Sequence, residues 1–316
     1  LFIFICEMDK DDDIWDWKNW LKSNPYFLFE EDGITPNKKK IALYSQKAID
    51  AKEKGGDELT NFLTKQLNMW VTAKDGQYID LSKFKECESD LTLEDMKGKS
   101  AYLGFDLSKG GDLTSIALVF PLENNQIYIY SHSFMPELRL AEHEKTDDVP
   151  YRIWVREGLL TLTTGVFGIK TDYKFIVTHL KEIIERYDIK ILECGYDAHN
   201  AGSFLSDLDF LDCDLTEVKQ SAKSLNDATV DFALSVKATQ VLYDKRNSLL
   251  KWSIANATTV TNSFGEIKID KQSQKNRIDP VDAIIDAWKI MLINKKETVN
   301  NDEAVEEWLD LINKRR

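Results

Sequence analysis

The stretch GFDLSKGGDLTSIALV, residues Gly104–Val119, decides the fold. It closes one apolar run at Asp106, passes through a glycine-rich turn and opens a second run of β-branched and apolar residues. Together with its flanks it predicts three strands, over Ala101–Leu107, Thr114–Leu122 and Gln126–Phe134. Strands joined by such short turns form an antiparallel meander.

The rest of the second half alternates between strand and helix patterns. In chain order the sequence predicts helices over Tyr151–Glu157 and Tyr173–Tyr187, a strand over Ile189–Tyr196, a short helix over Ala201–Leu208, a strand over Asp212–Val218, a long helix over Asn226–Tyr243, a hairpin over Thr258–Asp270 and a helix over Pro280–Asn294. Alternation of this kind requires parallel strands with crossover connections. The expected fold class is α/β, a mixed sheet that is antiparallel first and parallel afterwards, flanked by helices.

Composition restricts what the chain can be. Hydrophobic residues make up 43% and charged residues 30%, which is typical of a globular protein. The longest apolar runs are far shorter than the roughly 20 residues of a membrane span, so we expect no membrane association. The four cysteines lack metal or disulfide spacing, which predicts an intracellular, reduced protein. A net charge of −13 repels polyanions, so any contact with nucleic acid must be local.

The N-terminal region reads as the end of another domain followed by a connector. Leu1–Cys6 is predicted as a short buried strand, and Lys39–Lys54 and Asp57–Leu67 as helices separated by a glycine pair. The chain begins without Met, so we expect sequence upstream of Leu1.

Two predicted strands end in nearly the same tripeptide, Gly104–Phe105–Asp106 and Gly195–Tyr196–Asp197. Ligands gather at the carboxyl ends of parallel strands, so Asp106 and Asp197 are candidate site residues. The alternative is that each aspartate caps a turn or a helix.

A third acidic group opens the last predicted helix. Asp279 before Pro280 is typical of a helix N-cap, and Asp282 suits the first turn, so capping alone accounts for both. Asp286, one turn beyond Asp282, is interpreted as part of a solvated helix face, with a distant metal ligand as the alternative. Four carboxylates from three elements would repel one another unless a divalent cation neutralised them, and Mg²⁺ or Mn²⁺ prefers such oxygen ligands. Two such ions ~3.5–4 Å apart activate water and stabilise a leaving oxygen.

Basic residues precede this helix. Lys268, Lys271, Lys275 and Arg277 form a candidate phosphate-contacting rim, and Lys109 lies in the glycine-rich turn after Asp106. A solvated hairpin and an ordinary turn are the alternatives.

Several of these motifs, in this order, resemble one family. GFDLSKGGDLTSIALV, GYDAHNAG and RIDPVDAIIDAW are similar to the RNase H-like nuclease domain of the large terminase subunit of tailed phages. WLKSNPYF and FLTKQLNMW resemble the connector after that protein's ATPase domain. The resemblance implies that Asp106, Asp197, Asp279 and Asp282 hold two Mg²⁺ or Mn²⁺ ions and are catalytic.

The resemblance also implies a domain organisation and a role. Residues 1–95 would be the end of the ATPase domain and a helical connector, 96–295 the nuclease domain and 296–316 a charged C-terminal helix. The implied activity is metal-dependent cutting of double-stranded, concatemeric viral DNA during packaging, with ATP used only by the missing upstream domain. Implied partners are DNA, the small terminase subunit, the portal protein and further copies of the chain, in the host-cell cytoplasm.

Two other functions stay open at this point. An actin-like or sugar-kinase-type ATPase also begins with a strand ending in Asp, but its D-x-G-x-T turn differs from Asp106–Lys109. A non-catalytic DNA-binding or motor-docking scaffold would keep the fold and bind no metal.

Overall fold

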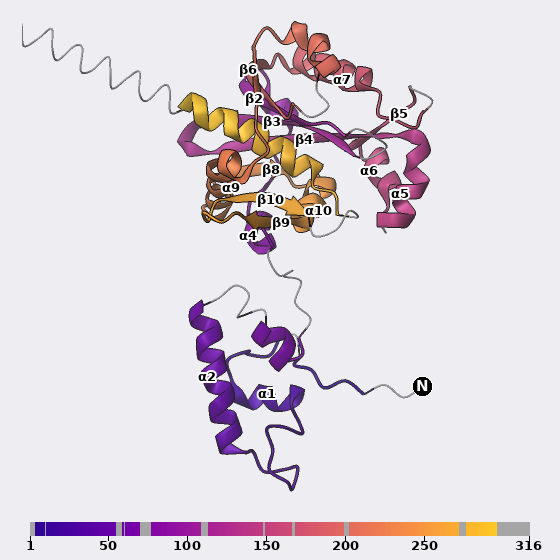
Figure 1. Cartoon of the computed structure of the whole chain (residues 1–316). Helices are drawn as coiled ribbons and strands as arrows, with labels where there is room; N and C mark the ends of the chain where they lie inside the picture. The colour runs from indigo at the N-terminus through magenta and orange to yellow at the C-terminus, as the bar shows by residue number, and fades with distance from the viewer. Residues whose placement is uncertain are drawn as a thin grey trace, which may run out of the picture. The chain divides into compact units, whose positions relative to one another are not determined.

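The chain forms two compact units, Leu1–Gln77 and Tyr78–Arg316 (Figure 1). The structure is a computed structural model that describes residues 4–9, 11–54, 59, 61–69, 77–108, 113–147, 149–165, 168–198, 202–271 and 276–295. None of the described helices is both long and apolar enough to cross a membrane.

The first unit is a small helical body. Its elements are α1 (Trp17–Ser23), α2 (Lys38–Lys54) and the π-helical turn η1 (Phe62–Gln66). The Asp16 side chain caps α1 by accepting from the Lys18 N–H. Trp20 is buried at the centre, with its ring 5.9 Å from that of Phe62. The small core explains why this region reads as a connector in the sequence.

The predicted strand at the N-terminus is absent from Phe4–Cys6, the part of it that the structure describes. Phe4 and Ile5 are instead 76% and 59% exposed. A strand needs a neighbour for its backbone hydrogen bonds, and no described strand pairs with this segment.

The second unit is built on an eight-stranded mixed sheet. The meander consists of β2 (Ser100–Asp106), β3 (Thr114–Pro121) and β4 (Ile127–Pro136), which pair antiparallel as predicted. The parallel strands are β1 (Glu88–Ser89), β5 (Leu160–Thr163), β6 (Lys190–Tyr196), β7 (Asp214–Glu217) and β8 (Val241–Asp244). The strand order is β1-β8-β4-β3-β2-β6-β7, with β5 on β4.

Helices and short turns join these strands. They are α4 (Leu81–Glu86), η2 (Leu93–Met96), η3 (Glu123–Asn125), η4 (Glu137–Arg139), α5 (Leu140–Asp147), α6 (Tyr151–Arg156), α7 (Tyr173–Tyr187), α8 (Gly202–Leu205), η6 (Ser206–Leu211), α9 (Ala222–Lys237), α10 (Ser248–Asn256) and the helix over residues 279–295. A separate hairpin pairs β9 (Ala257–Thr261) with β10 (Ile267–Lys271), as predicted.

The sheet carries a core on each face. On one face α7 and α8 pack on apolar side chains such as Phe105 and Leu118. On the other, α9 and the 279–295 helix, drawn in yellow in Figure 1, bury Trp288 and Phe232. The sequence predicts a sheet flanked by helices because the central strands are apolar on both faces, and each face must then be covered.

One predicted helix is too long. The helix expected over Asn226–Tyr243 begins earlier, at Ala222, and ends at Lys237, and Val241–Asp244 forms β8. Thr239 has a positive φ of 56°, which breaks the helix between the two elements. Val241 and Tyr243 are buried in the sheet, and that burial favours a strand over continued helix.

The boundary between the units lies earlier than residue 95. Ile79, Phe84 and Cys87 share a core with Tyr243, and β1 pairs with β8, so this segment packs within the second unit. The predicted C-terminal helix, 296–316, lies outside the described residues.

Candidate active site

The two strand endings noted in the sequence lie side by side. β2 and β6 pair in parallel, with Gly104 opposite Gly195 and Phe105 opposite Tyr196, whose rings stack at 5.9 Å. Side chains alternate along a strand, so Asp106 lies on the face of Gly104, and Asp197, just past the end of β6, continues that of Gly195.

These two glycines allow the last helix to lie directly on the strands. A Cβ on Gly104 would clash with the Ala283 carbonyl oxygen and stand 2.6 Å from the Ala287 nitrogen. A Cβ on Gly195 would stand 2.8 Å from the Asp286 carbonyl oxygen. The close approach places the acids of the helix beside the strand ends, which explains why glycine precedes each aspartate by two residues.

The acids of all three elements border one pocket of about 220 Å³. Its wall consists of Asp106, Asp197, Gln220, Lys268, Ile269, Asp270, Lys271, Ile278, Asp282 and Asp286. Asp279, the first residue of the helix, is buried and stands close enough to act on the charges of Asp106 and Asp282. The predicted four acids therefore belong to one electrostatic site.

Burial and mutual repulsion govern this site. Burial raises the pKa of Asp106 well above its ordinary value, and the charges of Asp279, Asp282 and Asp197 raise it further, against a small opposing effect of Lys271. Burial, Asp279 and Asp286 likewise raise the pKa of Asp282. The folded chain thus holds its carboxylates in an arrangement that favours a bound proton or cation.

Asp286 borders the site and does not lie on the solvated helix face that the sequence favoured. It is 2% exposed rather than solvated, and Gln220 Nε2 donates to its Oδ1 at 2.9 Å. The available signal was its spacing, because residues 282 and 286 are four apart and share a helix face. Gln220 gave no signal, since it lies in an irregular segment after β7.

The donor chemistry fits a divalent cation, although the described residues form no complete coordination shell. Among the residues that the structure describes, no group of three His, Cys, Asp or Glu side chains is close enough to hold a metal ion as it stands. The carboxylates are nevertheless hard oxygen donors, and the pKa values of Asp106 and Asp282 are raised first by burial and then by neighbouring negative charges. Such a set suits Mg²⁺ or Mn²⁺, which takes carboxylates together with water.

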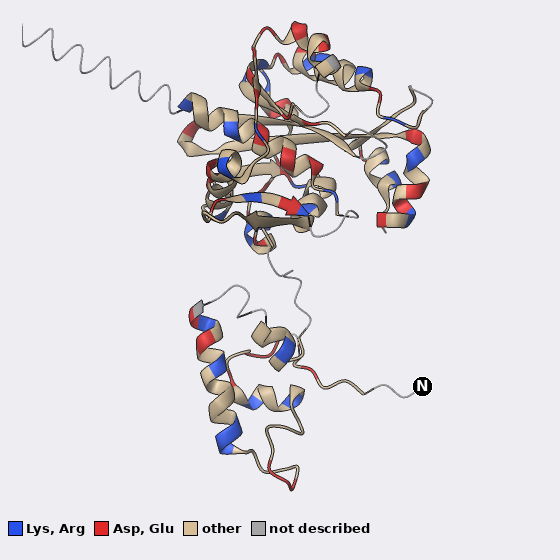
Figure 2. Cartoon of the chain, viewed as in Figure 1, with Lys and Arg blue, Asp and Glu red and all other residues tan. Residues whose placement is uncertain are grey.

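Of the predicted basic rim, two residues line the acid pocket and one is buried elsewhere. Lys268 and Lys271 lie on β10, where Figure 2 marks the basic residues, and both line the acid pocket. Arg277 does not belong to the rim: it is 7% exposed, and its Nε donates to Asp147 Oδ2 at 3.1 Å. Lys109 and Lys275 lie outside the described residues.

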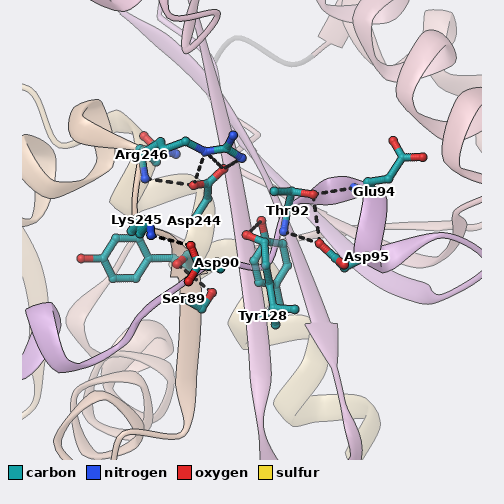
Figure 3. Close-up of polar contacts among 12 residues, drawn as sticks. Ser89, Asp90, Thr92, Glu94, Asp95, Tyr128, Asp244, Lys245 and Arg246 are labelled. Atoms are coloured by element: carbon teal, nitrogen blue, oxygen red, sulfur yellow. Dashed lines mark hydrogen bonds and ion pairs between the residues drawn. The ribbon is translucent and has the colours of Figure 1, made fainter.

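A second, larger pocket of about 760 Å³ is lined in part by Thr92, Tyr128, Asp244 and Arg246, which Figure 3 labels. One ion pair lines it: Arg246 Nε and Nη2 donate to the two carboxylate oxygens of Asp244 at 2.9 and 2.7 Å. Burial acts to raise the pKa of Asp244, but Arg246 reverses the direction and the pKa is lowered. This pocket carries no cluster of repelling acids among its described residues.

Comparisons with known proteins identify the family of this chain. The family described as "Terminase large subunit, endonuclease domain" matches residues 1–295. The large terminase subunit of Enterobacteria phage HK97 is 28% identical over 87% of this chain and 51% of its own length, and protein YmfN of Escherichia coli K12 is 26% identical over 95% and 65%.

A solved structure gives the same result for the fold. The crystal structure of the HK97 large terminase matches 90% of this chain and 56% of its own, at 26% identity and a TM-score of 0.60. The chain thus spans about half to two thirds of the length of these relatives. The matched residues include β2, β6 and the acid-bearing helix, and the chain belongs to the family of terminase large subunit endonuclease domains.

Proposed function

We propose that this chain is a metal-dependent endonuclease that cuts double-stranded, concatemeric viral DNA during genome packaging. The observation that carries the proposal is the convergence of acids from β2, β6 and the 279–295 helix on one pocket. Asp106, Asp197, Asp279 and Asp282 are the proposed catalytic residues and the ligands for Mg²⁺ or Mn²⁺. A pair of such ions, when bound, lowers the pKa of an attacking water and stabilises the leaving oxygen.

The other polar residues of the pocket hold the acid-bearing helix in place and supply positive charge. The side-chain amide of Gln220 donates to Asp286, and Lys268 Nζ donates to the backbone carbonyl oxygen of Gln220 at 3.2 Å. Gln220 therefore links the 279–295 helix to β10. Lys268 and Lys271 supply positive charge where DNA phosphates would approach. Contacts of this kind do not distinguish bases, so we infer cutting with little sequence preference.

Local charge reconciles this function with an acidic chain. The net charge of −13 opposes DNA binding as a whole, whereas the two β10 lysines offer cations at the pocket itself. Lys109 and Lys275 are proposed to extend this surface.

The remaining roles extend to the whole terminase. ATP hydrolysis would belong to an upstream domain, and the small terminase subunit, the portal protein and further copies of the chain would assemble with it in the host cytoplasm. The region before the nuclease domain would be the end of that ATPase domain and its connector, and residues 296–316 a charged helix.

Incubation of supercoiled plasmid with the purified protein tests the proposal. We expect nicked and linear DNA with Mg²⁺ or Mn²⁺, and intact plasmid once EDTA is added. A second candidate, a non-catalytic DNA-binding scaffold, is favoured by the missing preformed coordination shell among the described residues. DNA binding without cleavage under either ion would support the scaffold and refute the nuclease.

A further inference from the structure

A buried ionic cluster lies just before the acid-bearing helix. Arg277 stands two residues ahead of Asp279, and its side chain is 8% exposed while that of its partner Asp147, at the end of α5, is 1% exposed. Arg277 Nε and Nη2 lie 3.1 and 3.4 Å from the two oxygens of Asp147. A two-pronged contact of this kind fixes the direction as well as the distance between its partners.

Both carboxylate oxygens of Asp147 accept hydrogen bonds from more than one group. Tyr151 and Thr146 donate their hydroxyl groups to Asp147 at 2.8 and 2.9 Å, so each carboxylate oxygen accepts both a hydroxyl and a guanidinium N–H. His143 Nδ1 lies 3.0 Å from Arg277 Nη2 and 3.5 Å from Asp147. Arginine has no acceptor atom, so Nδ1 accepts from it and the ring proton resides on Nε2.

The backbone beside Arg277 begins the helix. The Ile278 carbonyl oxygen accepts from the Val281 and Asp282 N–H groups at 2.7 and 3.0 Å, the first hydrogen bonds of the helix. Ile278 itself lines the acid pocket. The Asn256 amide donates to the Arg277 carbonyl oxygen at 3.5 Å, which adds a weaker attachment to α10.

We propose that Arg277 is a positioning residue for the active site: held by Asp147 and His143, it sets where the acid-bearing helix begins and so where Asp279 and Asp282 stand. The inference rests on the proposed function. A buried ion pair contributes little net stability compared with apolar residues of similar volume, so its presence at this position is better explained by geometry than by stability. Residues that orient metal ligands are the comparable case.

The chain offers a matched control. Arg246 and Asp244 form a two-pronged pair at 2.9 and 2.7 Å that is more exposed than the Arg277 pair; it is shown in Figure 3 and borders the larger pocket rather than the acid pocket. Arg277→Met and Arg246→Met therefore remove the same chemical contact at two places. Arg277→Lys keeps the charge but loses the fork.

The test is calorimetric titration of Mn²⁺ into each purified variant, with amide hydrogen exchange across residues 278–283 as a second readout. We expect Arg277→Met to weaken Mn²⁺ binding by roughly 10–100-fold, the usual loss when a group that orients ligands is removed. Arg277→Lys should fall between, and Arg246→Met should match the parent. Exchange at 278–283 should quicken in Arg277→Met alone.

Each failure has a separate meaning. Parental Mn²⁺ affinity and parental exchange in a folded Arg277→Met would overturn the positioning role. If the parent neither binds Mn²⁺ nor cuts plasmid, the proposed nuclease function fails, and exchange still decides whether Arg277 fixes the helix start. Should Arg277→Met not fold, the double variant Asp147→Leu with Arg277→Met removes both buried charges. That variant is expected to fold with weakened Mn²⁺ binding, and parental affinity in it would refute the inference.

Discussion

The two pockets of the second unit differ in size and in charge balance. The larger, about 760 Å³, holds carboxylates such as Asp244 whose charge is matched by Arg246 close by. The smaller, about 220 Å³, is lined by Asp106 and Asp282. Burial raises the pKa values of both, and the negative charges of neighbouring aspartates raise them further. Size alone would select the wrong pocket. Like charges gathered in one buried place favour the smaller pocket as the site that we propose, because groups with strongly perturbed pKa values cluster at functional sites.

The largest effect should come from neutralising an acid of the smaller pocket, with an acid of the larger pocket as the control. Asp106→Asn keeps the shape of the side chain and removes a charge, so we expect plasmid cleavage to fall by at least ~10³-fold, about 4 kcal/mol of activation free energy. Asp197→Asn should behave alike. Asp244→Asn, in the larger pocket, should cleave within a few-fold of the parent. Equal rates for all three variants would remove the distinction between the pockets.

The next effect is a loss of stability when the close contact between β2 and the 279–295 helix is disturbed. Gly104→Ala places a methyl group against the backbone of the last helix, so we expect a loss of roughly 3 kcal/mol in unfolding free energy. Gly202→Ala on α8 is the control, since an added Cβ there meets no atom within 4 Å. Urea unfolding measures both. A parental midpoint for Gly104→Ala would contradict the close helix–strand contact.

Divalent ions should stabilise the protein through the acid pocket. At 100 times the dissociation constant, binding to the folded state adds about 2.7 kcal/mol, so Mg²⁺, Mn²⁺ and Ca²⁺ should each raise the melting temperature. Ca²⁺ should support little cleavage because its looser coordination positions water less well. Calorimetry of Asp106→Asn should show a smaller shift, and that of Asp244→Asn the parental shift.

This stabilisation should also depend on pH. The pKa values of Asp106 and Asp282 are raised in the fold, so their protonated forms add stability below the ordinary value that is lost as pH rises through the raised values. The shift caused by Mg²⁺ should therefore grow with pH over that window. A shift independent of pH, or equal in Asp106→Asn, would place the ion elsewhere.

The smallest effect is expected from the lysines. Lys268→Ala with Lys271→Ala should weaken DNA binding and lower the log–log salt slope by roughly one unit per lost phosphate contact. The control, Lys245→Ala with Lys251→Ala, removes two cations that do not line the acid pocket. Titrations of labelled duplex at several salt concentrations measure both. Equal slopes would mean that DNA does not pass over β10.

The sequence predicts the sheet well because the central strands carry their own signal. Runs such as Ser100–Asp106 are apolar on both faces and end in a turn, so local pattern and tertiary burial agree. β8 was missed because only three residues separate it from the end of α9, so its four residues look like a continuation of the helix. The N-terminal strand was wrongly expected because an apolar run does not say whether a pairing partner exists.

The part of the site that the sequence predicts is the one in which a glycine and an aspartate stand two residues apart at the end of a strand. Gly104 with Asp106 and Gly195 with Asp197 give both the helix contact and the acid in one motif. Arg277 was misassigned because a basic residue near acids reads as a phosphate contact, whereas its buried partner Asp147 lies far away in sequence. Pairing across such distances leaves no local pattern.

Anomalous scattering from a crystal of the protein soaked in Mn²⁺ tests the central claim most directly. The account predicts a peak in the acid pocket, within coordination distance of the Asp106 carboxylate and of Asp197 or an acid of the last helix. A crystal whose acid pocket stays empty while Mn²⁺ binds beside Glu94 or Asp244 in the larger pocket would contradict it.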